Sequence, residues 1–153
     1  YNSISCIHKS IFSFIYMQCE ICIREPGSHS FKKLCILENI TYFYTCPNDA
    51  KKYDDVSGIL LHYENMISSR ETDNWTYILD CSGFRLKHMV TYQVGIALVG
   101  LLSKYDSSLQ KIYIINPNFY IYTMVSMIWP VLTRSMRERI VYDDKNAFFM
   151  EKK

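Results

Sequence analysis

The chain has 153 residues, which is the length of one domain. Hydrophobic residues make up 49%, charged residues 21%, and the formal net charge is +2 at pH 7. These values exclude a disordered charged tail, which combines low hydrophobicity with high net charge. They also give no support to nucleic-acid binding, whose footprint is a markedly basic domain. We therefore expect one folded domain with no nucleic-acid partner.

The apolar run near the start and the cysteines bear on the cellular compartment of the protein. The apolar run at 11–17 is shorter than the roughly 18–20 residues of a membrane-spanning helix, and no small-residue cleavage site follows it. Six cysteines allow three disulfides in a secreted protein, but a chain of this length builds a core without them. We expect reduced thiols and a cytoplasmic location, with secretion as the alternative. The cysteines are Cys6, Cys19, Cys22, Cys35, Cys46 and Cys81.

The elements begin after a poorly defined segment, residues 1–30. The turn chemistry of Pro26-Gly27 closes that segment. Residues 34–44 are rich in β-branched and aromatic side chains and predict a strand. Residues 54–69 then show helical spacing of apolar positions, with Asp54 or Asp55 placed as the N-cap.

Strands and helices continue to alternate in the second half. Residues 86–102 are apolar on most of the helix circumference and need cover on more than one side. The helix at 120–132 is also apolar nearly all round, and Pro130 ends or kinks it. Short strands are predicted at 75–80, 111–115 and 139–142. This alternation predicts an α/β fold with a mostly parallel sheet flanked by helices.

Three cysteines and a histidine near the start are candidate metal ligands. Cys19, Cys22, His29 and Cys35 are zinc-type ligands within 17 residues. However, residues 18–23 alternate like a strand, which would point Cys19 and Cys22 to opposite faces. A thioredoxin-like pair would need a helix start after a strand. We therefore expect structural thiols and no metal site, and keep a zinc-stabilised module as the third hypothesis.

The turn after the predicted strand at 75–80 places Cys81 and Ser82 where α/β folds bind ligands. A hydrolase elbow needs glycine where Asp80 stands, and a cysteine phosphatase needs arginine where Lys87 stands. Neither phosphate-binding glycine motif occurs among the five glycines, and no histidine is paired with a nucleophile. We predict a structural turn, no catalytic residues, no cofactor and no enzymatic activity.

Arginines follow the apolar helix at positions 134, 137 and 139. Two interpretations stay open at this point. They are a solvated helix end, where cations meet the helix dipole favourably, or a surface for an anionic headgroup, which arginine's planar donors suit.

Three stretches together resemble a known family. They are residues 75–84, a strand ending in Asp and Gly; residues 108–117, the next strand; and residues 129–142, the end of a helix leading to the last strand. Residues 40–67 are similar to the family's preceding strand and helix. The sequence from Ile40 onward resembles the CRAL-TRIO domain in its divergent branch, the lipid-binding fold of phosphatidylinositol transfer and retinaldehyde-binding proteins. We expect residues 31–153 to form this domain.

The resemblance implies a sheet floor and a helical gate, at 119–132, over an apolar pocket for a lipid. It implies a non-enzymatic lipid-binding or lipid-transfer function, with a phosphoinositide-type ligand favoured and peripheral membrane targeting. Arg134 and Arg137 are expected at the headgroup or membrane surface. The alternative is a protein-interaction module for a partner such as a small GTPase or its regulator, as in divergent members of the family. The expected pocket residues are Val94, Leu98, Leu101, Phe119, Met124, Ile128 and Trp129.

Overall fold

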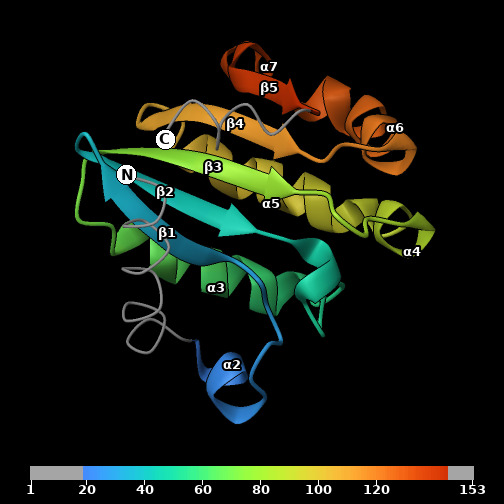
Figure 1. Cartoon of the computed structure of the whole chain (residues 1–153), viewed down its shortest axis with the longest axis horizontal. Helices are drawn as coiled ribbons and strands as arrows, with labels where there is room; N and C mark the ends of the chain where they lie inside the picture. Colours follow the sequence, from blue (N-terminus) through green and yellow to red (C-terminus); the bar gives the residue numbers. More distant parts are fainter. Residues whose placement is uncertain (1–18, 145–153) are drawn as a thin grey trace.

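A five-stranded sheet organises the computed structural model, which describes residues 19–144 (Figure 1). Strand order in space equals order in sequence, with β1 antiparallel to β2 and every other neighbouring pair parallel. This confirms the predicted α/β class. The strands are β1 (Lys32–Leu37), β2 (Ile40–Thr45), β3 (Asn74–Asp80), β4 (Leu109–Ile115) and β5 (Ile140–Asp143).

Helices connect the parallel strands. The longer ones are α3 (Val56–Ser68), α5 (Tyr92–Lys104) and α6 (Phe119–Ile128). Short helical segments complete the set: α2 (Glu20–Arg24), η1 (Pro47–Asp49), α4 (Leu86–Met89), η2 (Trp129–Val131) and α7 (Arg134–Arg139). No helix within residues 19–144 is long and apolar enough to cross a membrane.

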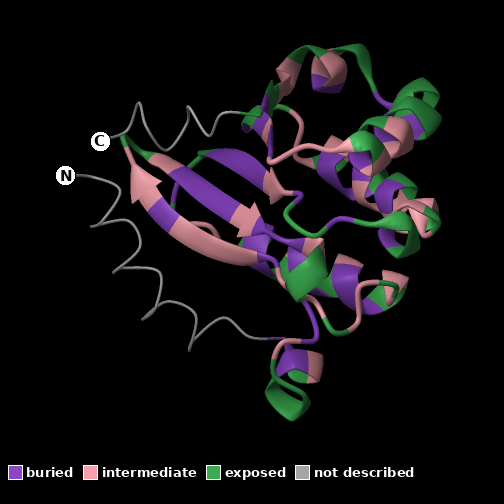
Figure 2. Cartoon of the chain, turned by 45° about the vertical axis from the view of Figure 1, so that its right-hand side comes forward, coloured by how far each residue is buried: buried purple, intermediate pink, exposed green. Residues whose placement is uncertain are grey.

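The long helices pack on one face of the sheet, and Figure 2 shows their buried sides toward the strands. The main core joins this face to the helices through residues such as Trp75, Tyr77 and Ile112. Because side chains alternate along a strand, Tyr42, Ile78 and Ile115 belong to a second cluster on the opposite face.

The strand predicted at 34–44 is in fact a hairpin of two strands. Glu38 and Asn39 form the turn, both with positive φ (51° and 63°), which is the geometry of a tight two-residue connection. Asn tolerates this region and Glu does so rarely. The prediction was wrong because the usual Asn-Gly signal is missing.

The predicted start of the first long helix is confirmed: Asp55 is the N-cap of α3 and accepts from the Gly58 amide. Three other helix boundaries differ from the prediction. The helix predicted at 86–102 is divided into α4 and α5, because the Thr91 amide and hydroxyl both donate to the His88 carbonyl. α6 ends at Ile128, two residues before Pro130, and the six-residue α7 was not predicted.

The strand-like alternation predicted at 18–23 is also wrong. From Glu20 this segment forms the helix α2, with Cys19 as N-cap, rather than an alternating strand. Cys19 and Cys22 therefore do not point to opposite faces, since residues three apart share one side of a helix.

Candidate functional site

An apolar cavity lies between the helices and the sheet. Its walls come from α5 and α6, from the helix-facing side of β3 and β4, and from parts of α3 and α7. Its volume is about 160 Å³. Small-molecule sites usually start at roughly 300 Å³. The cavity volume is therefore about half of that lower limit.

Four of the seven expected pocket residues line this cavity. Val94 and Leu98 reach it from α5, and Met124 and Ile128 from α6. The other three lie elsewhere: Leu101 is buried in the core outside the cavity wall, Phe119 is 72% exposed, and Trp129 is 39% exposed. The periodicity of an all-round apolar helix could not distinguish its inner from its outer face.

Two tyrosine hydroxyls are the polar groups on the floor. Tyr63 from α3 and Tyr77 from β3 share a hydrogen bond of 2.8 Å. Burial raises the pKa of Tyr63 to about 12, although hydrogen bonds from Tyr77 and Thr45 oppose that rise. Burial also raises the pKa of Tyr77. Both phenols stay neutral at physiological pH and serve as hydrogen-bonding groups.

His88 in the cavity wall is a polar residue that the sequence did not single out. Its ring stacks on Phe84 and meets Tyr53 edge-on. Its Nδ1 accepts from the Arg85 amide at 3.0 Å, which leaves the proton of the neutral ring on Nε2. Burial lowers the pKa of His88, and the nearby charges of Lys87 and Arg85 lower it further. Among described residues, Nε2 of His88 is the buried side-chain nitrogen or oxygen without a hydrogen-bond partner.

The outer surface of α6 and η2 is unusually apolar for an exposed surface. Phe119, Tyr122, Met127, Trp129 and Val131 are all exposed there. Leu86 on α4, which contacts α6, and Val90 just after α4 are exposed as well. This apolar outer surface stands on the other side of α6 from the cavity residues.

The three arginines after α6 have different surroundings. Arg134 is almost fully exposed and pairs with Glu138 one helical turn away. Arg137 lies over the Trp129 ring and donates to the Trp129 carbonyl. Arg139 is partly buried and pairs with Asp106, so it has a structural role. The first two remain available at the surface beside the apolar outer surface.

The turn after β3 is held by a polar network. Asp80 accepts from Tyr44, Asn116 and Ser82. Burial would raise the Asp80 pKa, but these hydrogen bonds outweigh it and lower the pKa. Gly83 follows with φ +72°, and a Cβ there would lie 2.4 Å from the Asn48 amide. The network gives the turn a structural role, in line with the prediction.

The cysteines also fit structural rather than nucleophilic roles. Cys46 and Cys81 are buried free thiols, and burial raises the pKa of both, to about 11 for Cys46. A thiol with a raised pKa is a poor nucleophile.

A second cluster of side chains lies beside one end of the cavity. The ligand-type atoms of Cys19, Cys22, His29 and His62 all lie within 4.8 Å of one another, and all four residues are buried. Cys35, considered with the first three from the sequence, lies instead in the cluster on the opposite face of the sheet. His62 was missed because it is 33 positions after His29 and no local spacing connects them.

Comparisons with known proteins agree with this architecture. A family model described as the CRAL/TRIO domain matches residues 5–152. The crystal structure of Sfh5 matches with a TM-score of 0.58 at 13% sequence identity, covering 92% of this chain and 59% of that chain. This chain thus spans less than two thirds of Sfh5, and at such identity the likeness concerns the fold. The search of curated proteins gave no match. The chain belongs to the CRAL/TRIO domain family, whose proteins bind lipids or other hydrophobic ligands and are generally not enzymes.

Proposed function

We propose that this domain binds a lipid in the cavity beneath α6, without catalysis, and does so at a membrane surface. The observation that carries the proposal is the cavity itself, whose wall is apolar on α5, α6 and the sheet. Burying apolar surface is the main driving force available to such a site. Polar groups in the wall, Tyr63, Tyr77 and His88 among them, are of the kind that fixes a ligand's orientation.

Helix α6 has the two faces that a gate requires. Met124 and Ile128 face the cavity, while Phe119, Tyr122 and Met127 are exposed. Exposed apolar surface of this kind marks a contact with a membrane or another protein. A bilayer would cover the outer face while α6 moves outward, and that movement would enlarge the cavity enough for an acyl chain.

A phosphoinositide-type ligand is favoured by the cations beside the gate. Arg134 is exposed, and Arg137 is held against Trp129 at the end of the apolar outer surface. Arginine pairs with phosphate through two parallel hydrogen bonds. Aromatic residues next to arginines also suit the boundary between a bilayer and water.

Lipid extraction from the purified chain tests the proposal. We expect mass spectrometry to find a co-purified lipid, and we expect binding to vesicles that contain phosphoinositide to exceed binding to neutral phosphatidylcholine vesicles. A purified protein without extractable lipid, and without binding to either type of vesicle, would overturn it.

The second candidate is a protein-interaction module for a partner such as a small GTPase or its regulator. The small volume of the cavity, about 160 Å³, favours it, because a domain that fills its own pocket needs no ligand. The exposed apolar surface of α6 would then be the partner's docking surface. A Leu98→Trp variant distinguishes lipid binding from partner binding. The larger side chain should fill the cavity and remove lipid binding, but it should leave binding of a protein partner to the outer face of α6 intact.

A further inference from the structure

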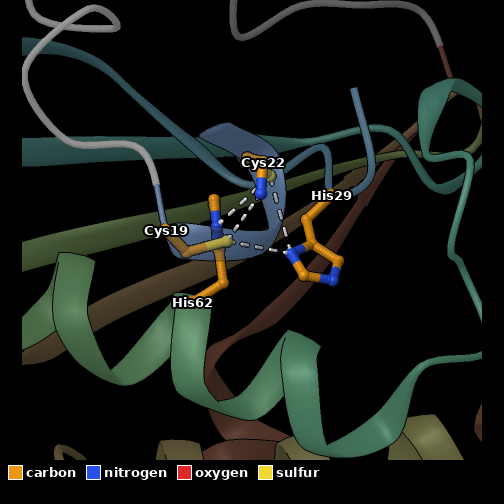
Figure 3. Close-up of side chains that lie close together, drawn as sticks. All are labelled: Cys19, Cys22, His29 and His62. Carbon is orange, nitrogen blue, oxygen red and sulfur yellow. Dashed lines mark hydrogen bonds between the residues drawn. The ribbon is translucent and has the colours of Figure 1, made fainter. Parts of the chain in front are cut away.

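Four side chains from three separate segments meet beside the cavity. Cys19 and Cys22 come from α2, His29 from the loop before β1, and His62 from the middle of α3. Figure 3 shows the two cysteines and His29 gathered over α3. This cluster has no part in the lipid-binding proposal, although His29 also borders the cavity.

The distances within the cluster match a metal centre. Nδ1 of His29 lies 3.4 Å from Sγ of Cys19 and 3.7 Å from Sγ of Cys22, and Nδ1 of His62 lies 3.9 Å from Sγ of Cys22. Tetrahedral zinc, with Zn–S near 2.3 Å and Zn–N near 2.0–2.1 Å, places sulfur and nitrogen ligands about 3.5 Å apart. The four atoms therefore need only small shifts to surround one ion.

Both imidazoles are held in the tautomer that a metal requires. Nε2 of His62 lies 2.6 Å from the Phe31 carbonyl, which only accepts, so Nε2 carries the proton. Nε2 of His29 lies 3.3 Å from the Asp55 carboxylate in the same way. Each Nδ1 therefore turns a lone pair toward the thiols. A carbonyl or carboxylate on the second nitrogen is the usual support of a zinc-bound histidine.

Hydrogen bonding among the thiols explains the cluster less well. Cys19 could donate to Nδ1 of His29 at 3.4 Å and Cys22 to Nδ1 of His62 at 3.9 Å, but the second of these is long for a hydrogen bond. Thiols are also weak donors. A divalent ion in place of the two thiol protons satisfies all four atoms, and the two thiolates balance its charge.

The surrounding sequence is built to hold this arrangement. Cys19 caps α2 and accepts from the Cys22 amide, which brings the two sulfurs to the same side. Asp55 both caps α3 and faces His29. At five residues, α2 is too short to be stable alone, so a connection to α3 would fix its position.

We propose that Cys19, Cys22, His29 and His62 bind one Zn²⁺ ion in a tetrahedral structural site that fastens α2 to α3. Binding releases the two thiol protons to solvent, and no redox change is involved. The site is closed, with four protein ligands and no open position for a substrate.

Metal analysis of the chain, purified with reductant and no added metal, tests the proposal. We expect one zinc per chain in the wild type and loss of that zinc in the Cys22→Ser and His62→Asn variants. Cys46→Ser is the matched control, because Cys46 is another buried free thiol outside the cluster. Co²⁺ in place of Zn²⁺ should give the visible absorption of a tetrahedral site with thiolate ligands.

If the ligand variants fail to fold, Asp55→Asn provides a second test of the zinc site. Asparagine caps a helix as well as aspartate does, so α3 keeps its start, while His29 loses its charged partner. We expect zinc affinity to fall about 10- to 100-fold, as it does when the hydrogen-bond partner of a metal-bound histidine is changed. Folded wild-type protein that contains no stoichiometric zinc and gives no tetrahedral Co²⁺ spectrum would overturn the proposal, as would a Cys19–Cys22 disulfide in the reduced preparation.

Discussion

The cavity and the cysteine–histidine cluster adjoin one another but are built on different principles. The cavity is lined by many apolar side chains, and its cover is a helix with an exposed outer face. The cluster depends on four buried atoms and on the partners that orient them. We infer that the cavity end of the domain is suited to movement and the cluster end to rigidity.

Charges inside the cavity should have the largest effect. We expect Met124→Asp together with Ile128→Asp to abolish lipid capture, because an unpaired carboxylate in an apolar cavity is strongly unfavourable. The measurement is lipid content by mass spectrometry, with folding monitored by circular dichroism. Leu61→Asp is the control, since Leu61 is exposed on α3, outside the cavity and away from the outer face of α6. A folded double variant that keeps its lipid would place the binding site elsewhere.

Glycine substitutions should separate the rigid end from the tolerant one. A Cβ on Gly58 would lie 2.0 Å from Asp55 Oδ2 and 2.9 Å from Ile21. We expect Gly58→Ala to lower the free energy of unfolding by about 1–3 kcal/mol and to disturb the contact between Asp55 and His29. In the cavity wall, a Cβ on Gly95 would lie 2.6 Å from the terminal methyl group of Met124, a flexible side chain that can move aside. We expect Gly95→Ala to change the free energy of unfolding by less than about 1 kcal/mol in urea denaturation, and equal losses at the two sites would contradict the contrast.

The buried His88 should make stability depend on pH. Burial, together with Lys87 and Arg85, holds its folded-state pKa below 6.5, so the unfolded chain takes up the proton first as pH falls. Its contribution is complete above pH 6.5 and is lost as pH falls toward the folded-state pKa, by about 1.4 kcal/mol per unit of pKa difference.

Urea denaturation at pH 7.5 and pH 5.5 measures this loss. His88→Phe keeps an aromatic ring between Phe84 and Tyr53 but has no proton to take up. The variant should lose less stability on acidification than the wild type. Identical losses would show that His88 does not titrate differently in the folded state.

The smallest effect is expected at the surface. Arg134→Gln should weaken binding to anionic vesicles by about 1 kcal/mol, roughly five-fold, because each cation near a charged membrane contributes about that much. Its effect on folding should stay within about 0.5 kcal/mol, since the side chain is exposed. Unchanged vesicle binding in a sedimentation assay would remove Arg134 from the membrane surface.

Patterns within short stretches of sequence predicted most of the fold. The alternation of strands and helices, the Asp55 cap and the end of α6 near Pro130 each follow from neighbouring residues. The hairpin at Glu38 and Asn39 was missed because a positive φ at Glu38 is favoured by the paired strands and not by the residue itself. α2 was mistaken for a strand because five residues are too few to separate the two periodicities.

The sequence by itself determined the family, the α/β order and the presence of an apolar segment at 119–132. Tertiary structure alone decided which side of that segment faces the cavity, leaving Met124 and Ile128 inside and Phe119 and Trp129 outside. It also decided that His62, and not Cys35, joins Cys19, Cys22 and His29. The physical reason is the same in both cases. Helical periodicity and local spacing fix what neighbours along the chain share, whereas the packing of α2, α3 and α6 against the sheet fixes which distant side chains meet.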